Sequence, residues 1–265
     1  MKLADRMKLY EGRESKRRLI PKLPVIARLD GRSFHSFTKG LGRPYSKPFL
    51  DLMFATTIHL VTKTKALVGY TQSDEISLVF YSDDVDSQIF FDSRIFKMVS
   101  ILASMCTLDF NKRLPNLLPR KQYENPMFDC RVWSVPDKQE VVNYLLWREQ
   151  DATRNSIQMA AQSLYSHKQL HKKNTGDLQD MLMEKGVNWN DYPYYCKRGQ
   201  YVQRKKVTRK FTTNELELLP PKHQAFSDPD LTVERHDVLG VELPPISTVT
   251  NMEDVIFNGD NVISL

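Results

Sequence analysis

Residues 66–81, with the sequence ALVGYTQSDEISLVFY, hold two apolar runs around a polar centre. The runs 66–70 and 76–81 have the β-branched and aromatic content of strands, and the stretch 71–75 between them is polar. This pattern predicts a β-hairpin, with Asp74 and Glu75 placed where its second strand begins.

The segments on either side of this hairpin have the periodicities of further helices and strands. A strand pattern precedes the hairpin and ends at Asp30 and Gly31. Two helical patterns and a final alternating strand pattern complete the order β-α-β-β-α-β over roughly residues 20–135, which is the ferredoxin-like arrangement of an α+β fold. The strand patterns are residues 25–29 and 128–132, and the helical patterns are residues 49–60 and 95–106.

The carboxylates of this region are expected to meet at one edge of the sheet. In the ferredoxin-like topology the first and third strands are central neighbours, so Asp30 would lie beside Asp74 and Glu75. Clustered carboxylates repel one another unless a cation compensates them, and Mg²⁺ prefers such oxygen ligands. The pattern therefore indicates a metal site, although an Asp-Gly turn and a solvated hairpin tip are the ordinary alternatives.

The second half of the chain changes in character. Residues 143–165 and 177–185 have helical patterns. The tail beyond residue 218 is rich in proline and is predicted to be irregular, with short strands near Val249 and Val255.

The charge of the chain favours a polyanionic partner. The formal net charge is +6, and seven Lys or Arg side chains fall within residues 197–210. That run, which includes Lys205 and Lys206, can contact RNA or form a solvated face.

The cysteines and the hydropathy exclude other classes of protein. Cys106, Cys130 and Cys196 form neither a zinc pattern nor a disulfide framework. No apolar stretch reaches the roughly 18 residues that cross a bilayer, and the first residues lack a signal-peptide pattern. We expect a cytoplasmic protein with no membrane partner.

Five motifs, in the right order and spacing, resemble those of the tRNA-histidine guanylyltransferase family. The resemblance extends from about Tyr10 to Gly199. The motifs are RLDGRSF at 28–34, QSDE at 72–75, FFDSRIFKMVS at 90–100, WREQDATRNS at 147–156, and GVNWN at 186–190 with KRG at 197–199.

The resemblance implies both an architecture and an activity. Residues 1–136 would form a polymerase-like palm, and residues 137–265 a helical and basic region packed on it. The enzyme would be a nucleotidyltransferase that uses two Mg²⁺ ions to add nucleotides to the 5′ end of tRNA, in the 3′→5′ direction, after that end is activated. Its partners would be tRNA, GTP, ATP and other nucleoside triphosphates, and it would form a homo-oligomer, most often a tetramer in this family.

The resemblance also assigns roles to residues. Asp30 and Asp74 would bind both metal ions together with the Gly31 carbonyl, and Glu75 would complete the catalytic carboxylates by supporting the site. The nucleotide would be contacted by Asp30, Gly31, Arg32, Ser33, Phe34, His35, Arg43, Ser73, Asp74, Arg94 and Lys97. The RNA would be contacted by Asn155, Lys173 and Asn190, to which the basic run adds Lys205 and Lys206.

One departure from the family pattern bears on the substrate. Eukaryotic members that mature histidine tRNA carry His-Ile-Asn-Asn where this chain has Thr153-Arg154-Asn155-Ser156. The difference favours the guanylyltransferase-like branch, whose members repair truncated tRNA 5′ ends against the opposite strand.

Three alternatives stay open at this point. The first is dedicated, untemplated addition of G to histidine tRNA. The second is a non-enzymatic, ferredoxin-like RNA-binding module, for which clustered carboxylates would repel phosphate. The third is a palm-type nucleotide cyclase, against which the long basic second half argues.

Overall fold

The computed structural model of the chain describes residues 1–84 and 87–265, and its described strands form one antiparallel sheet. The strand order is β4-β1-β3-β2-β5-β6. The strands are β1 (Val25–Gly31), β2 (Val68–Gln72), β3 (Glu75–Phe80), β4 (Phe128–Ser134), β5 (Gln200–Lys210) and β6 (Thr232–Val241).

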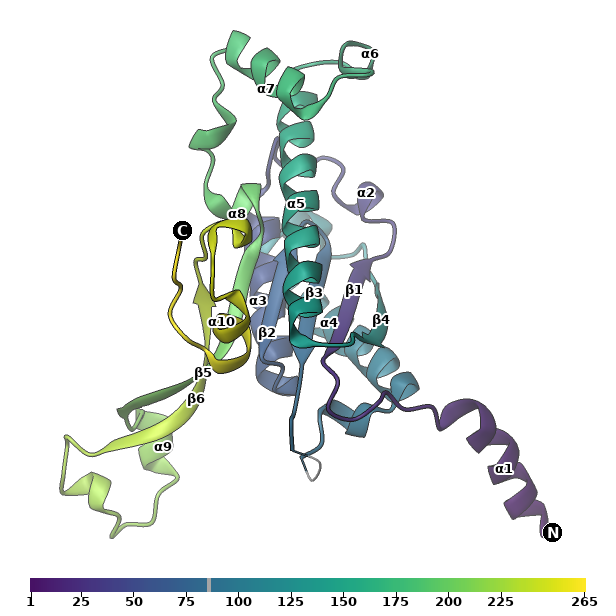
Figure 1. Cartoon of the computed structure of the whole chain (residues 1–265), viewed down its shortest axis with the longest axis vertical. Coiled ribbons are helices and arrows are strands. Elements are labelled where there is room, and N and C mark those ends of the chain that lie inside the picture. Colours follow the sequence, from purple (N-terminus) through teal and green to yellow (C-terminus); the bar gives the residue numbers. More distant parts are fainter. Residues whose placement is uncertain (85–86) are drawn as a thin grey trace.

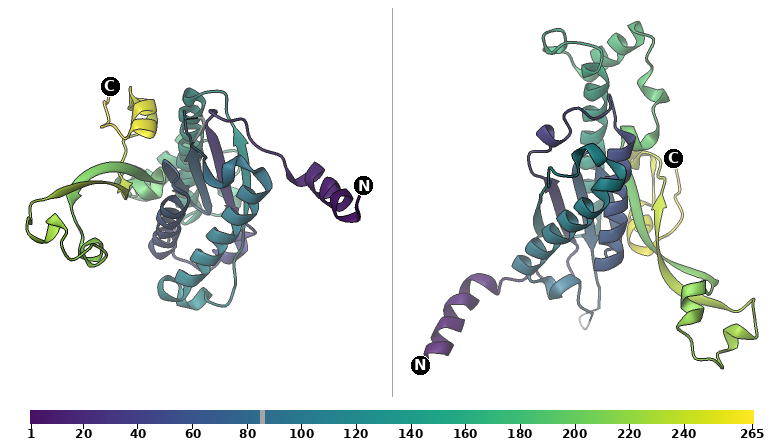
Figure 2. Two further views of the ribbon diagram at one scale, coloured as in Figure 1. Left: turned by 90° about the horizontal axis from the view of Figure 1, so that it is seen from below. Right: turned by 180° about the vertical axis from the view of Figure 1, so that it is seen from behind.

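Helices cover both faces of this sheet. Helices α3 (Lys47–Thr64) and α4 (Ile95–Leu117) lie on one face, and α5 (Lys138–Gln162) with α10 (Met252–Asn258) lies on the other (Figures 1 and 2). Strands covered on both faces are apolar almost throughout rather than alternating. Because helices lie on both faces of the sheet, every residue of β3 is buried.

The predicted β-α-β-β-α-β order is confirmed, and with it the α+β, palm-like fold. β1 pairs with β3 and with β4, and β2 forms a hairpin with β3. The hairpin turn is short, because Gln72 and Glu75 are already paired across it. Asp74 therefore lies in the turn itself, and Glu75 is the first residue of the strand.

The C-terminal part is more regular than predicted. The basic run is strand β5, which pairs with β2, and the supposedly irregular tail contributes β6 as the partner of β5. The strand predicted near Val255 is wrong, because that residue lies in α10, whereas Val249 forms an isolated bridge with Ser264. Pairing between distant segments supplies this order, and a local pattern does not show it. The division at residue 136 stays a prediction, although β5 and β6 continue the same sheet.

The remaining helices lie around the ends of the sheet. α5 begins at Asp137, whose side chain accepts a hydrogen bond from the Glu140 amide. Among the described residues no helix is both long and apolar enough to cross a membrane. The other helices are α1 (Leu3–Ser15), α2 (Phe34–Phe37), α6 (His167–Leu170), α7 (Thr175–Glu184), α8 (Tyr194–Lys197) and α9 (Thr213–Glu217).

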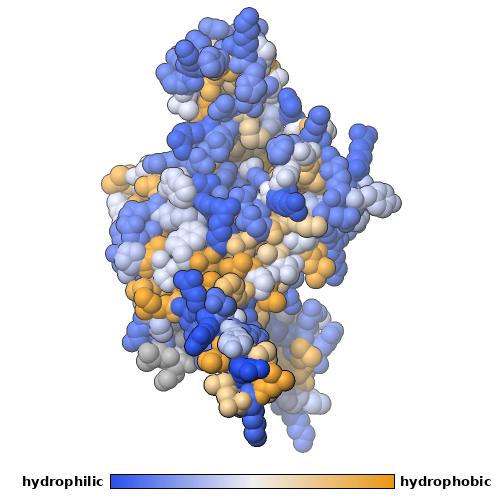
Figure 3. All heavy atoms as spheres, turned by 90° about the vertical axis from the view of Figure 1, so that its right-hand side faces the viewer, coloured by the Kyte–Doolittle hydropathy of each residue, from blue (hydrophilic) through white to orange (hydrophobic). Residues whose placement is uncertain are grey.

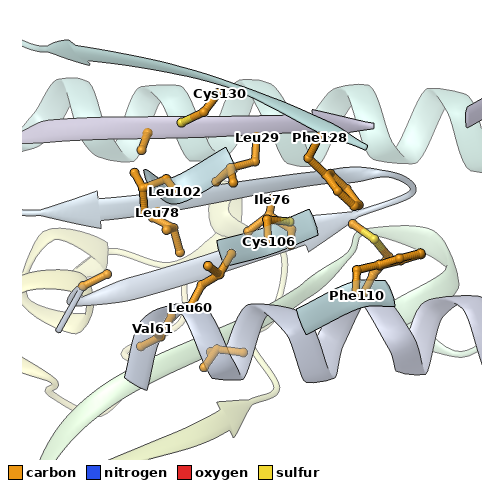
Figure 4. Packing of buried hydrophobic residues seen from close by; sticks show 14 of the residues in the cluster. Leu29, Leu60, Val61, Ile76, Leu78, Leu102, Cys106, Phe110, Phe128 and Cys130 are labelled. Atoms are coloured by element: carbon orange, nitrogen blue, oxygen red, sulfur yellow. The ribbon is translucent and has the colours of Figure 1, made fainter. Parts of the chain in front are cut away.

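The main hydrophobic core lies between the sheet and the α3–α4 layer (Figure 4). At the end of the sheet where β1 finishes, this core consists of aromatic rings. The Phe110 ring lies 5.2 Å from Phe128 and 5.7 Å from Phe34, measured between centroids. These rings support the loop that follows β1.

We predict that Phe110→Ala lowers the free energy of unfolding by about 3–5 kcal/mol, because it opens a cavity among fully buried rings. Urea unfolding monitored by circular dichroism measures the change. Leu218→Ala is the matched control, because Leu218 is 86% exposed and should change stability by less than about 0.5 kcal/mol. Equal effects for the two variants would contradict the assignment of this core.

Candidate active site

The end of β1 and the start of β3 place the predicted carboxylates side by side. Asp30 is the direct cross-strand partner of Glu75, and the Gly31 amide donates a hydrogen bond of 3.1 Å to the Asp74 carbonyl. Direct partners in an antiparallel pair project from the same face of the sheet. The sheet therefore brings these residues together at one edge, as the topology predicts.

Asp74 carries a charge that the protein only partly compensates. Its side chain accepts a 3.0 Å hydrogen bond from the Ser73 hydroxyl. Burial raises the pKa of Asp74, and the negative charge of Asp30 raises it further, whereas the hydrogen bonds and His35 oppose the rise. Asp30 and Asp74 are thus close enough to repel each other.

Asp30 has a basic neighbour, but the interaction between them is weak. Arg131 on β4 places Nη2 3.7 Å from the Asp30 carboxylate and 3.6 Å from that of Asp129. The Arg131 side chain is 53% exposed and the Asp30 side chain 39% exposed. Solvent-exposed pairs at such distances contribute little, so Asp30 is available to a stronger cation.

The loop after β1 is shaped by a glycine packed on an aromatic ring. A Cβ atom at Gly31 would lie 2.3 Å from the Phe34 ring, so no other residue fits without displacing that ring. The Phe34 side chain is buried in the core, so the nucleotide contact predicted for this residue stays a prediction that only its backbone could meet. Its neighbours Arg32, Ser33 and His35 are exposed beside the carboxylates.

Glu75 forms a buried ion pair with a residue of α5. The Arg148 guanidinium on α5 donates two hydrogen bonds to it, Nε to Oε1 at 2.7 Å and Nη2 to Oε2 at 2.9 Å. Burial raises the pKa of Glu75, and Arg148 opposes that rise. In the described part of the chain no three His, Cys, Asp or Glu side chains form a group suited to a metal ion. Asp30 and Asp74, unlike Glu75, have no close cationic partner in the described part of the chain.

Arg148 links Glu75, which follows the hairpin turn that carries Asp74 (the carboxylate turn), to a series of ion pairs along α5. Its Nη2 also donates to Asp151 at 3.1 Å, and Asp151 accepts from Arg154 at 2.8 Å. The Trp147 ring lies 4.5 Å from the Arg148 guanidinium carbon and 5.9 Å from that of Arg28. Sequence reasoning assigned no role to Arg148, although the residue lies within the WREQDATRNS motif.

A small pocket of about 60 Å³ opens beside the carboxylate turn. Asn155 on α5 and Ser73 line it together, which supports the predicted proximity of Asn155 to the site. Ser156 forms part of its wall, where its carbonyl accepts from the Tyr45 hydroxyl at 2.8 Å and its hydroxyl accepts from the Trp189 indole at 3.1 Å. Cys196 also lines the pocket, and burial raises its pKa to about 11. A thiol with that pKa stays protonated at neutral pH and is not a nucleophile.

Three other residues that were predicted to contact the nucleotide or the RNA lie outside the lining of this pocket. Asn190 follows Trp189, whose indole donates to Ser156 in the pocket wall, and the Asn190 carbonyl accepts from Lys197. Arg43 is exposed in the loop that leads to Tyr45. Lys173 is exposed between α6 and α7, near the far end of α5.

Four predicted contacts do not lie at this end of the sheet. Arg94 lines a cavity with Phe80, which is at the opposite end of β3, roughly 17 Å from Glu75 at about 3.4 Å per residue. Lys97 follows it on the first turn of α4, so neither side chain joins this chain's carboxylates. Lys205 and Lys206 lie on the outer half of the β5–β6 ribbon, and Lys206 pairs with Glu234 at 2.8 Å.

Known proteins resemble this chain over most of its length. The sequence model of the family described as tRNAHis guanylyltransferase (Thg1) matches residues 4–136. A solved bacterial tRNA(His) guanylyltransferase-like protein in complex with ATP is 34% identical; the match covers 97% of this chain and 99% of that one, with a TM-score of 0.78. A second such bacterial structure, in complex with GTP, is 32% identical over 92% and 94% of the two chains, with a TM-score of 0.69. The tRNA(His) guanylyltransferase of Saccharomyces cerevisiae is 28% identical over 71% of this chain and 85% of that protein.

A palm-like sheet and relatives of this kind define a nucleotidyltransferase. The chain belongs to the tRNA(His) guanylyltransferase family.

We predict that Arg148→Ala lowers the free energy of unfolding by about 3–5 kcal/mol, because it leaves the Glu75 charge buried without a partner. The two side chains are 7% and 10% exposed. Urea unfolding tests this, and Glu75→Gln combined with Arg148→Met should recover most of the loss. The control is Lys47→Ala, which removes an exposed ion pair with Asp51 and should cost less than about 1 kcal/mol. A loss for Arg148→Ala no larger than the control's would refute the buried pair.

We also predict that Asp74→Asn raises the melting temperature of the metal-free protein, and more so as pH rises from 4 to 8. The raised pKa of Asp74 means that its contribution to stability is full below the ordinary aspartate pKa and is lost as pH rises through the folded-state value. Asparagine removes that loss and can still accept the Ser73 hydrogen bond. Differential scanning fluorimetry in EDTA measures the effect, and Asp129→Asn, whose carboxylate is 58% exposed, should show a smaller one. A gain that does not depend on pH would count against a strained Asp74 charge.

Proposed function

We propose that this protein is a Mg²⁺-dependent 3′→5′ RNA nucleotidyltransferase that repairs the 5′ end of tRNA by templated addition after activation of that end. The observation that carries the proposal is the juxtaposition of Asp30 and Asp74 at the β1–β3 end of a palm-like sheet. The alignment of 97% of the chain with a guanylyltransferase-like protein supports it.

The donor set fits two Mg²⁺ ions. Asp30 and Asp74 offer hard carboxylate oxygens whose charge the protein compensates only in part, and the Gly31 carbonyl is the proposed backbone ligand. Mg²⁺ is commonly held by one or two carboxylates, with water and substrate phosphates completing its octahedron. When bound, the ions would activate the attacking hydroxyl and stabilise the leaving group.

The chain's own residues position the nucleotide around those ions. The exposed Arg32, Ser33 and His35 lie where a triphosphate would approach, and the conformation of their loop is fixed by Gly31 on the Phe34 ring. Basic side chains and exposed amides stabilise phosphate charge without reorganising during the reaction. Ser73 and the exposed Arg43 extend this surface toward the small pocket. Glu75, fixed by Arg148, would position the turn rather than bind metal.

The RNA would enter along α5 and the pocket beside it. Asn155 and the Asn190 region lie next to the carboxylate turn, and Lys173 lies farther along the same helix layer. On the β5–β6 ribbon, Lys206 is paired with Glu234, whereas Lys205 has no acidic partner among the described residues. Lys205 is therefore the stronger candidate for a phosphate contact.

Three observations favour templated repair over dedicated addition of G. Thr153 stands where the histidine-tRNA enzymes have His, and its hydroxyl donates to the Glu149 carbonyl within α5. Arg154 is paired with Asp151 rather than projecting into the pocket. The bacterial guanylyltransferase-like structure aligns with 97% of the chain, against 77% for the solved structure of the yeast enzyme.

We propose further that the enzyme acts in the cytoplasm as a homo-tetramer. The three cysteines are free, as is usual in a reducing compartment. Tetramers are the assembly that the family resemblance implies.

We predict that the purified protein extends a labelled tRNA that lacks its first nucleotide only with the nucleotide complementary to the opposite strand. Gel electrophoresis after incubation with Mg²⁺, ATP and each nucleoside triphosphate in turn measures this. Addition of G whatever the opposite base would point instead to histidine-tRNA maturation, and no addition would overturn the enzymatic proposal.

Matched variants test the metal assignment in the same assay. Asp30→Asn and Asp74→Asn should each lower the rate at least about 10³-fold, because each removes a carboxylate that would hold the Mg²⁺ ions, and those ions would stabilise the charge of the reacting phosphates. Asp129→Asn, a neighbouring carboxylate outside the proposed ligand set, should retain activity. Normal rates for either of the first two variants would sink the assignment.

A further inference from the structure

Trp147 on α5 is a large aromatic side chain that stays exposed near the carboxylate end of the sheet. It is 48% exposed, whereas Trp189 is 9% exposed and donates its indole hydrogen to Ser156. An indole ring left in water forfeits the free energy that burial of apolar surface supplies. The position of Trp147 therefore indicates a role outside the protein's own core.

The ring of Trp147 is the outer member of an aromatic row at the edge of the sheet. Its centroid lies 5.9 Å from that of Tyr144, which in turn lies 5.6 Å from that of Trp133 on the edge strand β4. Tyr144 is buried, and its hydroxyl shares a 2.7 Å hydrogen bond with that of Ser77 on β3. The row formed by Trp133, Tyr144 and Trp147 is thus anchored in the sheet.

Arginine side chains lie against the same ring. The Arg148 guanidinium carbon is 4.5 Å from the ring centroid of Trp147, and that of Arg28 is 5.9 Å from it. Arg28 is the direct cross-strand partner of Arg131, so both project from the face of the sheet that α5 covers. Cations at such distances are attracted to an indole ring and help to orient it. Figure 3, which views the molecule from the β4 side, shows hydrophilic side chains next to hydrophobic ones on this face.

The charges around the ring largely compensate one another in pairs. Arg148 is paired with Glu75 and with Asp151, and Arg131 lies 3.6 Å from Asp129. Fixed charge alone therefore gives this surface little affinity for a polyanion. Stacking on the exposed ring is the more specific attraction that it offers to a nucleic acid.

One structural role of Trp147 requires no ligand. The ring covers the guanidinium of Arg148 and so shields its buried ion pair with Glu75 from water. A leucine side chain would also shield that pair. A flat aromatic ring with nearly half of its surface exposed, next to arginine, goes beyond that need, and unpaired bases stack on surfaces of this composition.

Trp147 and the small pocket lie on opposite sides of α5. Ser156, which forms part of the pocket wall, follows Trp147 by nine residues. At about 100° per residue, the two side chains point roughly half a turn apart. The residues proposed to contact the nucleoside triphosphate lie in the loop after β1 and toward the pocket, so Trp147 is left to the RNA.

We propose that Trp147 stacks on an unpaired base of the RNA substrate and so holds the RNA end near the carboxylates. This subsite rests on the proposed function, because it assumes an RNA substrate at this edge of the sheet. It recognises the flat face of a base, and every base has such a face. A fully paired RNA end offers no base of this kind.

Three variants of the full-length protein separate stacking from shielding. Trp147→Leu keeps an apolar cover over Arg148 but removes the ring, and it should raise the KM for tRNA lacking its first nucleotide at least about tenfold. The kcat and the KM for the nucleoside triphosphate should stay within about twofold of the wild-type values, because only RNA binding is weakened. Trp147→Phe keeps a ring and should recover most of the affinity. Tyr10→Leu removes a similarly exposed ring on α1 and should change neither KM.

Tryptophan fluorescence reports the stacking without turnover. Short single-stranded RNA should quench the emission of the wild-type protein. Trp147→Phe should lose most of that quenching while still binding labelled RNA in an anisotropy titration. A blunt-ended RNA duplex, and a nucleoside triphosphate alone, should quench much less. Equal quenching by the triphosphate would assign the ring to the nucleotide and overturn the proposal, and so would equal quenching by the duplex.

The stacking role and the proposed function fail in different ways. Wild-type protein that adds no nucleotide to any tRNA would contradict the proposed function, whereas the fluorescence titration decides separately whether Trp147 stacks on RNA. Equal KM values for Trp147→Leu and Tyr10→Leu would overturn the stacking role and leave the proposed function intact. Equal losses in Trp147→Leu and Trp147→Phe would also overturn it, because both alter the packing and only the leucine removes the ring.

Discussion

The antiparallel pairing of β1 with β3 is the constraint on which the rest of this structure depends. It brings two segments separated by more than forty residues into direct register, so that Asp30 faces Glu75 and the Gly31 amide binds the Asp74 carbonyl. Without that register the carboxylates would be unrelated surface charges. With that register, Asp30 and Asp74 are fixed near each other at one edge of the sheet although their charges repel. The buried strands on both sides prevent the two residues from moving apart.

The two helical layers serve this edge in different ways. The α3–α4 layer supplies part of the aromatic core on which the loop after β1 rests, and Gly31 lies against the Phe34 ring that joins this core. The α5 layer approaches from the other face and clamps the first residue of β3 through Arg148. Apolar packing thus positions the loop after β1, and the ion pair with Arg148 positions the turn between β2 and β3. The candidate active site requires both.

Much of the fold could be predicted because its signals are local. The hairpin around Asp74 and the strand ending at Asp30 are visible as periodicity and turn residues, and topology then implies that they meet. Features that depend on distant partners could not be predicted. No local pattern shows that Glu75 belongs to Arg148, that Phe34 points into the core, or that β6 exists only as the partner of β5. The position of Arg94 near the opposite end of β3 could not be predicted for the same reason, because a motif marks a residue but not the end of the sheet at which it lies.

The buried pair of Glu75 and Arg148 has a consequence for the anionic substrate. A negative carboxylate next to the site would oppose the entry of any polyanion, and the guanidinium cancels that charge where solvent cannot. The site therefore carries less negative charge than the two acidic residues of the motif QSDE suggest, because one of them is paired with Arg148. Arg148 thereby limits the negative charge that an anionic substrate meets at this edge of the sheet.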